Sequence, residues 1–109
     1  MGDSLEVVRT FPKAVRDEIG FALYEAQLGD KNVSAKPLRG LGPGVLEVVS
    51  DHRGDTFRAV YTVRFKNRIY VLHAFQKKSK KGIATPGREI ELVRQRLKQA
   101  VALNELRED

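Results

Sequence analysis

The ten residues TFRAVYTVRF, from Thr56 to Phe65, decide the fold class of this chain. Successive side chains of a β-strand point to opposite faces of the sheet, so every second residue shares a face. One face of this stretch would carry Phe57, Ala59, Tyr61, Val63 and Phe65. The other face would carry Arg58, Val60, Thr62 and Arg64. The alternation predicts a β-strand with one apolar face and one face that includes arginines.

Two further strands are predicted beside this one, because turn-forming residues interrupt the chain on both sides. Val45–Ser50 is rich in β-branched residues, and the predicted turn Asp51–Asp55 follows it. Lys66–Arg68 forms the next turn, after which Ile69–Gln76 is a third run of β-branched and aromatic residues. Short turns join antiparallel neighbours, so we predict a three-stranded antiparallel meander.

Helical patterns lie on both sides of the predicted meander. Phe11–Leu28 follows Thr10, a predicted N-cap, and Gly29 ends it. Its apolar stripe consists of Val15, Ile19, Ala22, Leu23 and Ala26. A second helix is predicted from Thr85-Pro86 to about Leu103. Its apolar stripe consists of Ile90, Val93, Leu97 and Val101.

The remaining segments complete one domain over residues 1–109. Leu5–Val8 is a candidate first strand, and Lys36–Gly44 is dense in glycine and proline and is predicted to be loop after a short helical turn. Lys77–Ala84 is predicted to be a basic loop. The expected order is (β)–α–β–β–β–α, an α+β fold in which helices cover one sheet face and leave the other for a partner.

Composition excludes several classes of protein. The chain has 109 residues, 41% of them hydrophobic, and no cysteine, which excludes disulfides, thiolate catalysis and cysteine-based zinc sites. No apolar run approaches the roughly 20 residues of a membrane span. The first residues include Asp3 and Glu6 and lack the apolar core of a secretory signal. We therefore expect a cytoplasmic protein without membrane contact.

The net charge of +6 is unevenly distributed along the chain. Residues 1–50 hold six basic and seven acidic residues, whereas residues 51–109 hold fourteen and seven. From Arg64 to Arg88 there are eight basic residues and no acidic one. Such a half fits an anionic partner, which includes nucleic acid, an acidic protein and an anionic membrane. A basic face that contacts only solvent is the alternative.

Two segments of the predicted sheet carry a specific pattern: LEVVSDHRGDTFRAVY, residues 46–61, and VLHAFQKKS, residues 71–79. Thr85-Pro86, Glu89-Ile90 and the Arg/Lys-rich helix that follows complete it. Over residues 7–103 the chain resembles the phage Gp49-like (HigB-like) group of the RelE/ParE toxin superfamily. The resemblance implies a small twisted antiparallel sheet, two N-terminal helical segments packed on it and a C-terminal helix.

The resemblance also implies the toxin of a type II toxin–antitoxin pair. RelE-like and HigB-like members cleave mRNA on the ribosome without metal or cofactor, whereas ParE-like members inhibit DNA gyrase by binding. A cognate antitoxin neutralises them, commonly a helix-turn-helix DNA-binding protein in HigB-type operons, so this chain would meet DNA only through its antitoxin. A ribosome-dependent endoribonuclease, a gyrase-directed toxin and an inactive phage-derived homologue all remain open.

Arg58 is the first catalytic candidate that the resemblance supplies. It matches the strand arginine that RelE-like nucleases use on the scissile phosphate, and a guanidinium can contact two phosphate oxygens at once. Lys78 matches a position at which those nucleases carry a catalytic arginine. The predicted hairpin places Arg58 opposite Phe75 or Gln76, with Lys77 and Lys78 nearby. The alternatives are an exposed arginine on a sheet face and a lysine-rich loop in solvent.

Proton transfer would fall to other side chains. Histidine can shuttle protons near neutral pH, a role open to His73 and His52, although a structural histidine and an exposed turn residue are the respective alternatives. Glu47 is a candidate general base, or else an ion-pair partner of Arg58. Two histidines on separate elements make a histidine-based metal site improbable.

RNA binding would involve further cations and an aromatic ring. The candidates are Arg64, Phe75, Lys80, Lys81 and Arg88. An aromatic ring can stack on a base, a role open to Phe75 and Tyr61, although both also suit a core. The nuclease hypothesis requires Arg58, Lys77 and Lys78 to converge on one open, positively charged patch.

Overall fold

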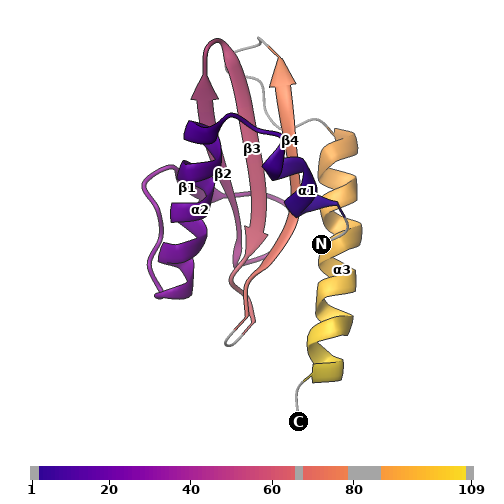
Figure 1. Cartoon of the computed structure of the whole chain (residues 1–109). Coiled ribbons are helices and arrows are strands. Elements are labelled where there is room, and N and C mark those ends of the chain that lie inside the picture. The colour runs from indigo at the N-terminus through magenta and orange to yellow at the C-terminus, as the bar shows by residue number, and fades with distance from the viewer. Residues whose placement is uncertain (1–2, 66–67, 79–86, 108–109) are drawn as a thin grey trace.

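The structure is a computed structural model that describes residues 3–65, 68–78 and 87–107, with only the backbone for Lys77, Lys78 and Arg107. Its elements are α1 Ser4–Arg9, α2 Lys13–Gln27, β1 Ala35–Pro37, β2 Val45–His52, β3 Asp55–Thr62, β4 Tyr70–Lys78 and α3 Gly87–Arg107. The strands form one antiparallel sheet in the order β1-β2-β3-β4 (Figure 1). This is the α+β fold that the resemblance implied, with two N-terminal helices and a C-terminal helix.

The hairpin of β3 and β4 has the register that the sequence predicted. Arg58 of β3 lies opposite Phe75 of β4. The turn between β2 and β3 is shorter than the predicted Asp51–Asp55, because both strands continue to a two-residue turn at Arg53-Gly54. These residues have φ of 51° and 86°, the positive values of a type I′ turn, whose twist suits an antiparallel hairpin.

The N-terminal segment is helical, so the predicted strand at Leu5–Val8 is wrong. A short apolar run is compatible with either a strand or a helix, and periodicity cannot separate them at this length. Thr10 ends α1, where its hydroxyl donates to the Val7 carbonyl at 2.6 Å. It therefore does not cap α2, whose N-cap residue is Pro12.

An edge strand lies where the sequence predicted a helical turn and loop. Ala35–Pro37 forms β1 and pairs with Leu46–Val48 of β2. Proline lacks an N–H and is tolerated on an edge strand, so Pro37 did not exclude this pairing. The segment from residue 38 to residue 44 is loop, as predicted.

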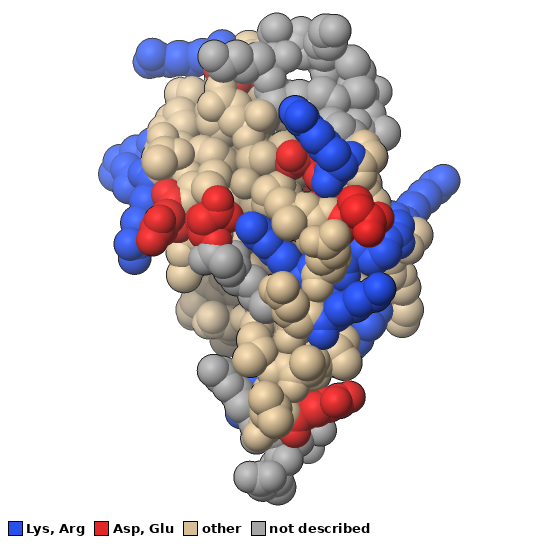
Figure 2. Space-filling model, turned by 90° about the vertical axis from the view of Figure 1, so that its right-hand side faces the viewer, with Lys and Arg blue, Asp and Glu red and all other residues tan. Residues whose placement is uncertain are grey.

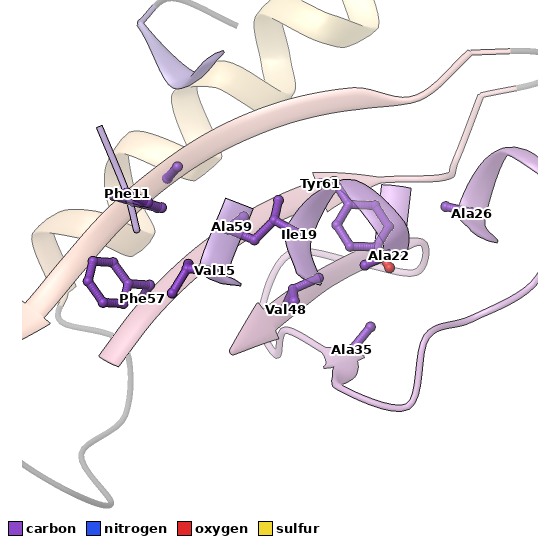
Figure 3. Close-up of a cluster of buried hydrophobic side chains, with 11 residues drawn as sticks. Phe11, Val15, Ile19, Ala22, Ala26, Ala35, Val48, Phe57, Ala59 and Tyr61 are labelled. Carbon is purple, nitrogen blue, oxygen red and sulfur yellow. The ribbon is translucent and has the colours of Figure 1, made fainter. Parts of the chain in front are cut away.

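Helices cover both faces of the sheet, so the prediction of one open face is wrong. Figure 3 shows α2 side chains, Ile19 and Ala22 among them, meeting Ala59 and Tyr61 of β3. This cluster consists of Phe11, Val15, Ile19, Ala22, Ala26, Ala35, Val48, Phe57, Ala59, Tyr61 and Ala74. A second cluster, between the sheet and α3, consists of Leu41, Val45, Val60, Leu72, Val93, Leu97 and Ala100.

Tyr61 lies fully inside the first cluster, so it is a core residue rather than a ring open to a base. Its hydroxyl has no hydrogen-bond partner among the residues that the structure describes. Burial, and secondarily the charge of Glu25, raises the pKa of Tyr61 above its ordinary value. The phenol therefore stays neutral in the core.

Arg64, which lies just after the end of β3, donates hydrogen bonds to the loop before β2. The Arg64 Nη2 donates to the carbonyl of Leu41 at 3.1 Å and to that of Pro43 at 3.2 Å. A Cβ on Gly44 would lie 3.2 Å from the backbone N and Cα of Arg64, and Gly44 has a φ of 80°. Glycine thus lets the loop approach the Arg64 backbone closely.

We expect Gly44→Ala to lower the free energy of unfolding by about 1–3 kcal/mol, because it adds a backbone clash to left-handed strain. The measurement is urea denaturation. Gly29→Ala is the matched control, since Gly29 has a φ of 86° and open space around a built Cβ. Equal losses in the two variants would contradict a clash with Arg64.

Candidate functional site

Glu47 and Arg58 form a buried ion pair on the sheet face that α3 covers. The Arg58 Nη1 lies 3.2 Å from the Glu47 Oε2, and their side chains are 10% and 2% exposed. Glu47 stands opposite Val60 across β2 and β3, on the face of the second core cluster. The open cationic patch expected around Arg58 is therefore closed in this structure.

This pairing limits what Arg58 can do chemically. A buried guanidinium is stable next to a carboxylate because each charge compensates the other in a medium of low polarity. A phosphate can reach Arg58 only by sharing or replacing Glu47 as its partner. Replacement would leave Glu47 as a nearby carboxylate that can accept a proton.

His73 lies on β4 beside this pair, and both of its ring nitrogens are engaged. Its Nε2 lies 2.7 Å from the Glu89 Oε2, and its Nδ1 lies 3.2 Å from the Arg96 Nη1. Arginine only donates, so Nδ1 accepts and Nε2 carries the proton toward Glu89. His73 therefore connects β4 to α3 as a hydrogen-bonded histidine, with its ring stacked on Phe75 at 5.2 Å.

Arg96 is a central residue of this network that the sequence analysis missed. Its Nη1 donates to the Leu72 carbonyl at 3.0 Å and to the Ser4 Oγ at 3.3 Å. Its Nη2 pairs with Asp3 at 3.1 Å. The only sequence signal was its place directly before Leu97 on the apolar stripe of the helix. Arg96 joins α1, β4 and α3 beside the Arg58–Glu47 pair.

We expect Arg96→Ala to lower the free energy of unfolding by about 2–3 kcal/mol, because several hydrogen bonds to one charged group are lost. Arg94→Ala is the matched control, expected to change it by less than about 0.5 kcal/mol. The Arg94 side chain is 41% exposed against 14% for Arg96, and its ion pair among the described residues is with Glu91 at 3.5 Å. Thermal unfolding measures both, and similar losses would contradict the role given to Arg96.

Further cationic candidates lie at the end of β4 and at the start of α3. The backbones of Lys77 and Lys78 end β4 opposite Thr56 and Asp55, two to three residues from Arg58 along β3. Arg88 is exposed in the first turn of α3. Lys80 and Lys81 lie outside the described residues. The structure thus groups Glu47, Arg58, His73 and Phe75, with the end of β4 close by.

Arg64 and His52 stand apart from this group. Arg64 follows the C-terminal end of β3, roughly 20 Å from Arg58 at 3.3 Å per strand residue. Its guanidinium donates hydrogen bonds to the loop before β2. His52 is the partly exposed last residue of β2, next to the turn. Neither side chain contributes to the Arg58–Glu47 pair.

A separate apolar surface lies on α2, and the sequence analysis did not identify it. Phe21, Tyr24 and Leu28 are each more than half exposed, and the first two rings lie 6.4 Å apart. Exposed aromatic residues of this kind are typical of protein interfaces. This surface and the Arg58 face belong to opposite sides of the sheet.

The described residues carry neither a membrane span nor a metal cluster. No helix among them is long and apolar enough to cross a membrane. Nor do their histidine and acidic side chains include a group of three that could hold a metal ion.

The architecture of four antiparallel strands between N-terminal helices and a C-terminal helix is the one expected of the RelE/ParE class. The family model described as "Phage derived protein Gp49-like (DUF891)" matches residues 6–98. The match covers most of the chain and includes every strand, so the chain belongs to the Gp49-like phage-derived family. We found no match to the chain among curated proteins or solved structures.

Proposed function

We propose that this chain is the toxin of a type II toxin–antitoxin pair and cleaves mRNA on the ribosome. Membership of the Gp49-like family supports the toxin role. The observation that carries the nuclease role is the position of Arg58, on a strand beside Phe75 and near the backbone positions of Lys77 and Lys78. Arg58 matches the phosphate-binding arginine of RelE-like nucleases.

The proposed reaction starts from the Glu47–Arg58 pair as a resting state. The scissile phosphate takes the place of Glu47 on the guanidinium, and Glu47 accepts the proton of the attacking 2′-hydroxyl. The O–P bond to the 2′-oxygen forms as the bond to the 5′-oxygen breaks, which leaves a cyclic phosphate. Lys77 and Lys78 stabilise the charge on the phosphate and Lys78 protonates the 5′-oxygen, without a metal. Substrate binding has to expose the buried pair.

The proposed antitoxin is a helix-turn-helix DNA-binding protein that also presents an acidic segment. Residues 51–109 carry fourteen basic and seven acidic residues, which favours an acidic partner at the cations used on RNA. DNA contact would then be indirect. Unchanged antitoxin affinity of a Lys77→Ala/Lys78→Ala variant at low salt would contradict direct masking of these lysines.

A gyrase-directed toxin is the second candidate, and the buried Glu47–Arg58 pair favours it. A buried guanidinium already neutralised by a carboxylate gains less from a phosphate, which fits a toxin that acts by binding alone. In this case the pair would have only a structural role.

Inducible expression in a bacterial host tests these proposals. The nuclease proposal predicts growth arrest, rapid appearance of new mRNA 5′ ends and the absence of these ends on a messenger that ribosomes cannot bind. Intact mRNA together with induction of the DNA-damage response would favour the gyrase-directed toxin. Normal growth at a confirmed level of folded protein would contradict both.

A further inference from the structure

A shallow hollow between α3 and the loop before β2 combines an apolar floor with a basic rim. Its volume is about 250 Å³. The residues that line it are Gly40, Leu41, Arg64, Arg94, Leu97, Lys98 and Val101. Three of these are basic and none is acidic. The hollow lies on the opposite side of α3 from Glu89 and Arg96, so it is separate from the candidate catalytic site.

The rim of this hollow is preorganised. The carbonyls of Leu41 and Pro43 accept hydrogen bonds from Arg64 and fix its guanidinium at the edge. The floor is anchored as well, because Leu41 and Leu97 belong to the second core cluster. A partner at this surface would therefore meet fixed positive charge around an apolar centre.

The exposed charges along this side of α3 run from acidic Glu91 through basic Arg94 and Lys98 to acidic Glu105. Arg94, Lys98, Val101 and Glu105 follow at spacings of four, three and four residues, which places them on one face of the helix. Figure 2 shows basic side chains in the middle of the face that carries α3, with acidic ones beside and above them and again near its lower, C-terminal end. A carboxylate near a helix C-terminus opposes the helix dipole, so local helix stability does not explain Glu105.

We propose that α3 packs antiparallel against α3 of a second copy of this chain across this hollow. A two-fold axis between residues 101 and 102 brings Lys98 of each copy opposite Glu105 of the other, with Val101 at the centre. The interface is self-complementary, as two-fold symmetry requires. In the antiparallel arrangement, the acidic Glu105 of one copy faces the basic rim of the hollow in the other. An RNA strand along the same face would instead approach Glu91 and Glu105, which are both exposed.

The pair Lys98 and Glu105 allows a test that is specific to two copies. Seven residues separate them, about 10 Å along the helix axis, so they are not neighbours within one helix. Reversing either charge places like charges opposite each other twice in the dimer. Reversing both restores opposite charges, although every local sequence environment has changed.

Sedimentation equilibrium of the purified chain at low salt, from about 10 µM to about 1 mM, measures the dimer. We expect a concentration-dependent dimer whose Kd rises at least about tenfold in Lys98→Glu and in Glu105→Lys. The double variant should return to within about threefold of the original Kd. Lys31→Glu and Glu6→Lys are matched controls, because they make the same changes in net charge at exposed residues elsewhere and should leave the Kd unchanged.

A monomer throughout the concentration range would overturn the proposal, and so would a dimer whose Kd is unchanged by both single charge reversals. Failure of the double reversal to restore the dimer would also overturn it. Binding of a single-stranded RNA or a poly-glutamate probe that needs Lys98, with the chain monomeric, would assign the hollow to a different partner. Circular dichroism confirms that each variant is folded.

Discussion

Glu47→Ala is expected to lower the free energy of unfolding by about 3–5 kcal/mol, measured by urea denaturation. The substitution leaves the guanidinium of Arg58 without the carboxylate that lies 3.2 Å away, at a side chain only 10% exposed. The cost comes from the uncompensated charge more than from a lost attraction. Arg58→Ala is expected to have a loss of similar size, because Glu47 is buried even more completely.

The double substitution Glu47→Leu/Arg58→Met separates these causes. It removes both charges and keeps the volume apolar, so most of the stability is expected to return. If the double variant were as unstable as the single ones, packing rather than charge would explain the loss. This result also affects the design of activity tests, since loss of toxicity in Arg58→Ala alone would be ambiguous between chemistry and unfolding.

Lys77→Ala/Lys78→Ala is expected to reduce mRNA cleavage by about 10²–10³-fold, because cations at the scissile phosphate stabilise the charge of the transition state. This expectation rests on the proposed nuclease function. Both lysines stand at the end of β4, opposite Asp55 and Thr56, where the strand ladder stops. The measurement is the yield of cleaved messenger on purified translating ribosomes, at equal protein concentration.

Lys36→Ala provides the matched control for this variant. Lys36 is an exposed cation on the edge strand β1, separated from β4 by two strands. It removes one positive charge where the test variant removes two, and it should retain full cleavage. Cleavage that persists in the Lys77→Ala/Lys78→Ala variant would remove these lysines from the mechanism, and loss of its folded circular dichroism signal would assign the effect to stability instead.

Elements with a strong repeating pattern could be predicted from the sequence. The alternation is confirmed from Phe57 to Thr62, where β3 ends, and the apolar stripe of α2 is confirmed as well, because many residues share the same period. Val93 and Leu97 of the predicted α3 stripe lie in the core, whereas Val101 lines a surface hollow. α1 and β1 could not be predicted from local pattern. Each is short, and its structure depends on the neighbour it packs or pairs with, β2 in the case of Ala35–Pro37. The family resemblance, rather than periodicity, correctly implied the second N-terminal helix.

The candidate site could be predicted only in part. The position of the turn predicted the strand register that places Arg58 opposite Phe75. For Glu47, the sequence allowed a general base or an ion-pair partner of Arg58, and the structure shows the ion pair. Burial could not be foreseen, since strand alternation gives the face of a side chain but not what covers it. The hydrogen bonds of Arg96 join residues more than ninety positions apart, so no local sequence pattern could predict them.

The bonds from Arg96 to Asp3 and Ser4 have a consequence for synthesis of the protein. They connect α1 to α3, so a growing polypeptide cannot form them until residue 96 has been translated. Products that stop before residue 96 would lack the bonds that hold Asp3 and Ser4 to α3. Copies that terminate before this residue should therefore be sensitive to proteolysis, whereas copies that include α3 form the bonds between Arg96 and the N-terminal residues.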